Sequence, residues 1–101
     1  MSTEELGKKG RAIRSLVARL VKVGPMRPGT LTVQYRHPAE RRSPFYQLSY
    51  THKGRSRSEY VRPESLPAIR GELAAYKTFR RLISAIIDLS LEASQLRHKR
   101  H

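Results

Sequence analysis

The sequence predicts a small α+β domain with an N-terminal helix, a three-stranded antiparallel β-meander and a long C-terminal helix. Apolar residues recur at helical spacing near the N-terminus, alternate with polar residues in the middle of the chain, and return to helical spacing towards its end. The 101 residues are enough for one small domain. We therefore predict a flexible N-terminus at 1–10, a single domain at 11–97 and a basic tail at 98–101.

The first helix is predicted at 11–23. Its apolar residues fall at i, i+3, i+4, i+7 and i+8, which places them in one stripe along the helix. Gly24 and Pro25 follow, as expected where a helix ends. The preceding stretch 1–10 is polar and contains two glycines, so we expect it to lie outside the helix.

Alternation of polar and bulky residues predicts three strands, at about 30–36, 45–51 and 55–61. Lys53 and Gly54 separate the second run from the third. Because glycine adopts positive φ without strain, this pair predicts a hairpin turn.

The length of the turn at Lys53 and Gly54 decides which residues of the third strand face the core. A two-residue turn places Arg55 and Arg57 on the apolar side and exposes Tyr60. A bulged turn, one residue longer, sends both arginines and Val61 to the outer face and makes Tyr60 a core residue. We prefer the bulged turn, because a one-residue slip exchanges the faces of a strand and only this choice keeps arginines off the core.

The last helix is predicted at about 64–97, and Pro63 suits its first turn. Apolar residues in its second half follow alternating spacings of four and three, as in a coiled-coil seam. About nine helical turns outreach one small sheet, so we assign this seam to a homodimer. The alternative is that the first helix folds back over the seam within one chain. The predicted dimerisation residues are Phe79, Leu82, Ile86, Leu89 and Leu96.

The charge of the chain points to a polyanionic partner. Lys and Arg total 21 against 8 Asp and Glu, a formal net charge of +13. Hydroxyl residues accompany the basic residues of the predicted sheet, and both groups commonly contact phosphates. A two-stranded β-ribbon fits the major groove of B-DNA. The alternative is a solvent face decorated with arginines. The predicted nucleic-acid-binding residues are Arg36, Arg41, Arg42, Lys53, Arg55, Arg57 and Arg62.

Other chemistry finds little support in the sequence. The chain has no cysteine, which excludes disulfides and thiolate catalysis, and its four histidines lack the spacing of metal ligands. The acidic residues are scattered and there is no glycine-rich phosphate loop, so we expect no enzyme, no metal and no cofactor. No apolar run approaches the roughly 20 residues of a membrane span. We expect a cytoplasmic protein without a membrane partner, nucleoid-associated if it binds DNA.

Four short motifs occur in order: PGTLTVQYR at 28–36, SPFYQLSY at 43–50, GRSRSEYVRP at 54–63 and AYKTFRRLI at 75–83. They resemble the PGSL…YR, GPYY.LSY, GK.RS.YVP and NYRRFRELL motifs of a domain-of-unknown-function family of small bacterial and archaeal proteins, often encoded near mobile-element genes. The resemblance implies a sheet followed by a helix and a link to mobile elements. The family's Cys-rich loop is absent here, so no zinc role is carried over.

Together these features predict a small basic, non-enzymatic DNA-binding protein that dimerises through its C-terminal helix. One alternative is an accessory subunit that associates with RNA or with a larger nucleoprotein machine. The other is an adaptor that binds proteins through its long helix.

Overall fold

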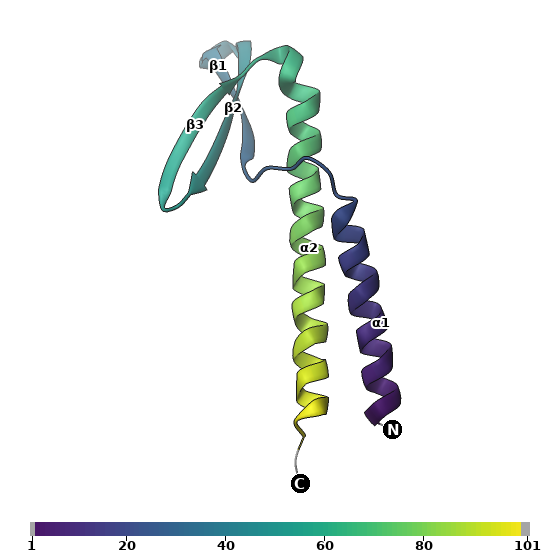
Figure 1. Ribbon diagram of the computed structural model, residues 1–101. Helices are drawn as coiled ribbons and strands as arrows, with labels where there is room; N and C mark the ends of the chain where they lie inside the picture. Colours follow the sequence, from purple (N-terminus) through teal and green to yellow (C-terminus); the bar gives the residue numbers. More distant parts are fainter. Residues whose placement is uncertain (1, 100–101) are drawn as a thin grey trace. The chain divides into compact units, whose positions relative to one another are not determined.

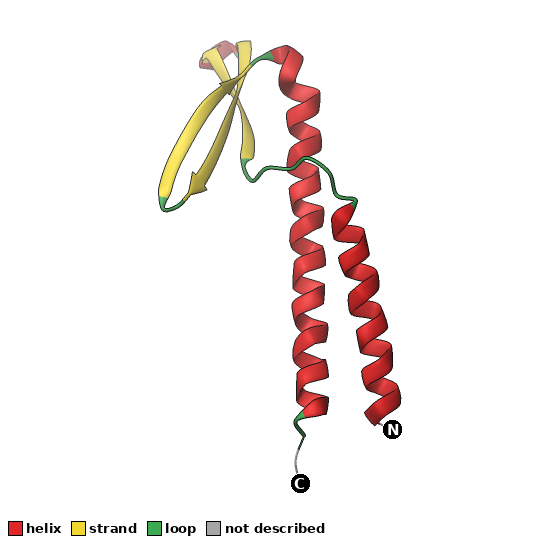
Figure 2. Cartoon of the chain, viewed as in Figure 1, coloured by secondary structure: helices red, strands yellow, loops and turns green. Residues whose placement is uncertain are grey.

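The computed structural model describes residues 2–99 and confirms the predicted α+β class (Figures 1 and 2). Where the sequence predicts one domain, the chain divides into two compact units. The helical unit contains Met1–Gly24 and Lys77–His101, and the sheet unit contains Pro25–Tyr76. The elements are α1 (Ser2–Val21), β1 (Thr30–His37), the 3-10 helix η1 (Pro38–Glu40), β2 (Arg42–His52), β3 (Arg55–Val61), the 3-10 helix η2 (Pro63–Ser65) and α2 (Leu66–Arg97).

The first helix is longer than predicted, because α1 begins at Ser2. The prediction that 1–10 precedes the helix is wrong for its described residues. Two acidic residues in the first turn lie at the positive end of the helix dipole. Lys9 Nζ lies 2.7 Å from Glu92 Oε1 on α2, and Leu6, Gly7 and Gly10 are half-buried, so these turns of α1 pack within the helical unit. At the other end of the chain, part of the predicted tail 98–101 lies outside the described residues.

In the helical unit, α1 runs antiparallel to the second half of α2 (Figure 1). Leu82 is 5% exposed and Ala93 is 4% exposed, and the other residues of the predicted dimer seam are half-buried. The seam therefore packs within one chain, as the alternative of a folded-back first helix describes. Leu82 is a core residue of the helical unit.

The sheet has the order β1-β2-β3, with both pairs antiparallel. Leu48 of the central strand pairs with Leu31 on β1 and with Glu59 on β3. β2 begins earlier than predicted and passes through Pro44. Proline is tolerated there because this end of β2 pairs with β1 alone.

The turn between β2 and β3 has two residues, so the predicted bulged turn is wrong. Lys53 has φ 51° and Gly54 has φ 76°, and positive φ at both positions is the signature of a type I′ turn. This register pairs Tyr50 with Arg57 and His52 with Arg55.

The register corrects three further predictions about β3. Arg55 and Arg57 lie on the same face as Leu48, not on the opposite face. Val61 is buried, at 6% exposed, and Tyr60 is 57% exposed instead of lying in the core. All three follow from the missing bulge residue, because a slip of one residue exchanges the faces of a strand.

The two faces of the sheet differ in composition. The inner face contains Leu48, which is fully buried, and Tyr46, whose ring lies 5.5 Å from the Arg70 guanidinium of the first part of α2. The residues of the outer face alternate with those of the inner face. The outer face consists of Thr30, Thr32, Gln34, Arg36, Phe45, Gln47, Ser49, Thr51, Ser56, Ser58 and Tyr60.

Candidate nucleic-acid interface

Residues 50–57 form a two-stranded ribbon that extends beyond the three-stranded sheet. The row of Thr30, Ser49 and Ser58 is the last one that includes β1. Past this row β2 pairs with β3 alone, and every residue from 51 to 60 is exposed. We call residues 50–57 the ribbon tip.

The two-residue turn does not bury the arginines of the ribbon tip. Arg55 and Arg57 lie on the inner face, yet both are exposed. Leu48 is the last fully buried residue along β2, and the strand continues four residues beyond it to His52. The ribbon tip therefore extends past the core, and an inner-face position there costs no burial of charge.

The ribbon tip has a positive charge without a compensating acid. Lys53, Arg55 and Arg57 lie in it, and residues 50–57 contain no Asp or Glu. Glu59 is adjacent to the tip, but its carboxylate pairs with Arg27, whose Nη1 lies 3.7 Å from Glu59 Oε1. Within the part of the chain that the structure describes, the three tip cations form no ion pair.

The structure separates the other predicted binding residues from the ribbon tip. Arg41 and Arg42 lie at the opposite end of β2, about 33 Å away along an extended strand. Arg42 Nη2 lies 3.0 Å from Glu40 Oε1, so part of the charge at this end is neutralised. Arg36 lies on the outer face, and Arg62 follows β3 at the same end of the sheet. The seven predicted residues thus form two groups and not one patch.

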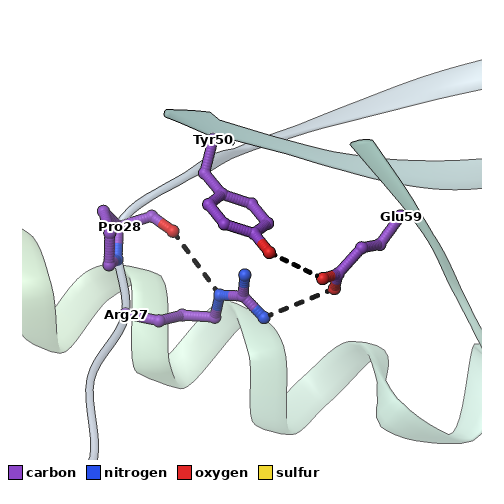
Figure 3. Close-up of polar contacts among 4 residues, drawn as sticks. All are labelled: Arg27, Pro28, Tyr50 and Glu59. Atoms are coloured by element: carbon purple, nitrogen blue, oxygen red, sulfur yellow. Dashed lines mark hydrogen bonds and ion pairs between the residues drawn. The ribbon is translucent and has the colours of Figure 1, made fainter. Parts of the chain in front are cut away.

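Sequence reasoning missed Arg27, which fixes the base of the ribbon (Figure 3). Its guanidinium carbon lies 4.8 Å from the centroid of the Tyr50 ring, and its Nη1 lies 3.7 Å from Glu59 Oε1. Its backbone N–H donates to the carbonyl of Glu72 on α2 at 3.2 Å. A loop arginine whose partners are distant in sequence leaves no local signal, so only the fold identifies it.

A shallow groove crosses the outer face and runs onto the ribbon tip. Ser49 Oγ lies 3.4 Å from Ser58 Oγ, and Thr51 Oγ1 lies 3.2 Å from Ser56 Oγ. Each hydroxyl has one proton and two lone pairs, so these pairs retain the capacity to bind phosphate and sugar oxygens. The groove is lined by Pro28, Gly29, Thr30, Ser49, Tyr50, Thr51, Ser56, Arg57 and Ser58.

An aromatic pair lies on the same outer face, further from the tip. The ring centroids of Phe45 and Tyr60 are 6.5 Å apart, with an interplanar angle of 43°. The Arg36 guanidinium carbon lies 5.1 Å from the centroid of the Phe45 ring. The outer face therefore combines hydroxyls, aromatic rings and one arginine, and none of its residues is acidic.

Comparison with protein-family models, curated proteins and solved structures found no match to this chain. In residues 2–99, no three His, Asp or Glu side chains are grouped so as to hold a metal ion. None of the described helices is sufficiently long and apolar to cross a bilayer.

Proposed function

We propose that this protein is a non-enzymatic nucleic-acid-binding protein that favours DNA and contacts the phosphate backbone through the ribbon tip. One observation carries this proposal. Lys53, Arg55 and Arg57 converge on an exposed two-stranded ribbon and lack ion-pair partners among the described residues. Such a ribbon matches the dimensions of the DNA major groove, in which arginine can bind guanine with two hydrogen bonds.

The remaining basic residues support the same partner. The helical unit contains twelve Lys and Arg against four acidic residues, and the sheet unit contains nine against four. Lys8, Arg11 and Arg19 are exposed on α1 and would add phosphate contacts without sequence information. Phosphate contacts of this kind strengthen binding and make it sensitive to salt.

We extend the proposal to a link with mobile elements, which rests on the motif resemblance in 28–83. A DNA ligand would place the protein at the nucleoid in the cytoplasm. RNA or a larger nucleoprotein machine is the alternative partner, because phosphate contacts do not distinguish the two nucleic acids.

We also propose that the protein forms a homodimer through the helical unit. Four large apolar side chains are exposed there: Val17 and Val21 on α1, and Ile87 and Leu91 on α2. Val17 and Val21 each come directly after a half-buried leucine, Leu16 or Leu20. Ile87 likewise comes directly after half-buried Ile86. A one-residue step turns about 100° around a helix axis, and in an antiparallel pair this brings the exposed residues to the same side. A one-sided apolar surface of this kind favours self-association, or the adaptor role if the partner is another protein.

A gel-shift salt series with duplex DNA, single-stranded DNA and RNA tests the nucleic-acid proposal. If about six phosphates are neutralised on duplex DNA, log affinity falls against log salt with a slope near −5. The triple variant Lys53→Ala/Arg55→Ala/Arg57→Ala reduces the magnitude of that slope by about 2 to 3.

The matched control is Lys8→Ala/Arg11→Ala/Arg19→Ala, which removes the same charge from α1. We expect it to lose less affinity than the ribbon-tip variant. Equal losses would contradict the role of the ribbon tip. If none of the three nucleic acids binds near physiological salt, the function is wrong and the adaptor role is favoured.

Analytical ultracentrifugation tests the dimer. Ile87→Asp shifts the protein to a monomer, whereas Ser15→Asp adds the same charge at an exposed polar position on the opposite side of α1 from Val17 and leaves a dimer. A monomeric wild-type protein contradicts this part of the proposal.

A further inference from the structure

The outer face of the sheet contains an exposed aromatic residue that the fold does not use. Tyr60 is 57% exposed, and its only described ring contact is with half-buried Phe45. Burial drives most aromatic side chains into the core, so a tyrosine held outward on a strand is available to a ligand. The two-residue turn at Lys53 and Gly54 fixes this orientation through the register.

The neighbours of Tyr60 favour a ligand with flat rings and anionic linkers. The Phe45 ring, on the central strand, contacts the Tyr60 ring, and the Arg36 guanidinium lies over the Phe45 ring. Ser58 lies two positions before Tyr60 on β3 and lines the near end of the hydroxyl groove. Aromatic rings stack with bases of any sequence, and hydroxyls contact sugar and phosphate oxygens.

Charge and shape complementarity select the occupant of this face. No acidic residue lies on it, whereas Arg36 lies at one end, the turn residue Lys53 lies at the other, and Arg57 lines the groove from the inner-face side of the ribbon. Tyr60 is its only exposed aromatic residue, and no large exposed aliphatic side chain accompanies it, so the face lacks the apolar patch of a protein interface. Bases within a duplex are stacked on each other and cannot reach Tyr60, so the strand must be unpaired.

We infer that the outer face binds an unpaired nucleic-acid strand, with Tyr60 stacked on a base and the groove hydroxyls on the sugar–phosphate backbone. This inference rests on the proposed function and extends it to unpaired strands. Single-stranded DNA and single-stranded RNA share the recognised chemistry, and the experiment distinguishes them. Ser49 and Ser58 are the hydroxyls closest to the stacked base, since they lie in the row next to the aromatic pair along the sheet.

Fluorescence anisotropy with four labelled ligands tests the inference: an oligothymidylate, an oligouridylate, an abasic strand with the same number of phosphates, and a duplex. Wild-type protein binds the base-bearing strands more tightly than the abasic strand. Tyr60→Ala lowers affinity for the base-bearing strands about 5- to 100-fold and leaves affinity for the abasic strand unchanged. Tyr60→Phe keeps the ring and retains wild-type affinity. The stronger of the thymidylate and uridylate complexes identifies the natural source of the strand.

The outcomes separate this inference from the proposed function. If Tyr60→Ala changes affinity for base-bearing and abasic strands equally, or changes neither, base stacking is wrong. Salt-dependent duplex binding that persists in that case leaves the proposed function intact. If none of the four ligands binds near physiological salt, both are wrong. Because Tyr60 is exposed, the variant folds, and its circular dichroism spectrum and unfolding midpoint serve as the control.

Discussion

The two faces of the sheet differ in how deeply their side chains are buried. Leu48 on the inner face is completely buried, and its chain neighbour Ser49 on the outer face is exposed. Side chains alternate along a strand, so adjacent residues belong to different environments. The inner face anchors the strands to α2, while the outer face leaves Tyr60 and the hydroxyl groove open to a ligand. A single slip of register would exchange these two roles.

The ribbon tip shows where this division ends. Arg57 occupies an inner-face position, opposite Tyr50, but lies beyond the last buried residue. The face on which a strand residue lies therefore determines its burial only where another element covers the sheet. Arg55 and Arg57 keep their inner-face positions and remain exposed for phosphate contacts.

The largest difference between the faces is expected from truncating Leu48. Leu48→Ala leaves a cavity in the inner face and lowers the free energy of unfolding by about 2–5 kcal/mol. Ser49→Ala, one position along the chain, changes it by less than about 0.5 kcal/mol. Urea unfolding followed by circular dichroism measures both. Similar losses would show that the outer face is also part of the core.

A second effect comes from Gly29, where the chain enters β1. Its φ is +144°, and an added Cβ would lie 2.8 Å from Leu48 Cδ1 and 3.2 Å from the carbonyl oxygen of Ser49. Gly29→Ala therefore lowers the free energy of unfolding by about 1–3 kcal/mol. Gly71→Ala is the control, because this helical glycine has nothing within 4 Å of an added Cβ. It raises the free energy of unfolding by about 0.5–1 kcal/mol. If Gly29→Ala stabilised the protein, the close packing of Gly29 against Leu48 and Ser49 of β2 would be wrong.

Removing the Tyr50 hydroxyl should have a smaller effect. Tyr50→Phe deletes the 2.8 Å hydrogen bond to Glu59 but keeps the ring beneath the Arg27 guanidinium. We expect a loss of about 0.5–1.5 kcal/mol, towards the lower end because water can reach the Glu59 carboxylate. Thermal unfolding measures it. Tyr46→Phe is the matched control, since the Tyr46 ring contact with Arg70 does not require the hydroxyl.

The smallest effect concerns the ion pair between Lys9 and Glu92 in the helical unit. Both side chains are partly exposed, so a double-mutant cycle with alanine gives a coupling of about 0.2–1 kcal/mol. Added salt weakens the coupling. A coupling of zero at low salt would contradict a stabilising ion pair between Lys9 and Glu92.

The sequence predicted the strands well, because alternation of bulky and polar residues is a local signal. Helix 2–10 was missed because its stabilisation comes from packing within the helical unit, where Leu6 is half-buried. The predicted register between β2 and β3 was wrong for another reason. Keeping arginines off the core favoured the bulged turn, but the sequence does not show that the core ends before Arg57. How far one element covers another is a property of the folded chain.

The candidate site was predicted only in part. The basic ribbon and its hydroxyls were found from composition, and the exposure of Tyr60 was linked to the two-residue turn. Arg27 was not found, because its partners Tyr50 and Glu59 lie far along the chain. The grouping of the aromatic pair with the hydroxyl groove requires the strand register, which the sequence left open.

Titration of the ¹⁵N-labelled protein with an unpaired oligonucleotide, followed by two-dimensional NMR, tests the central claim most directly. If the outer face and the ribbon tip bind the strand, the amide resonances of Arg57, Ser58 and Tyr60 shift in proportion to bound ligand. Those of Leu82 and Ala93, buried in the helical unit, remain in place. Shifts confined to α1 and α2, with the sheet unchanged, would contradict the account.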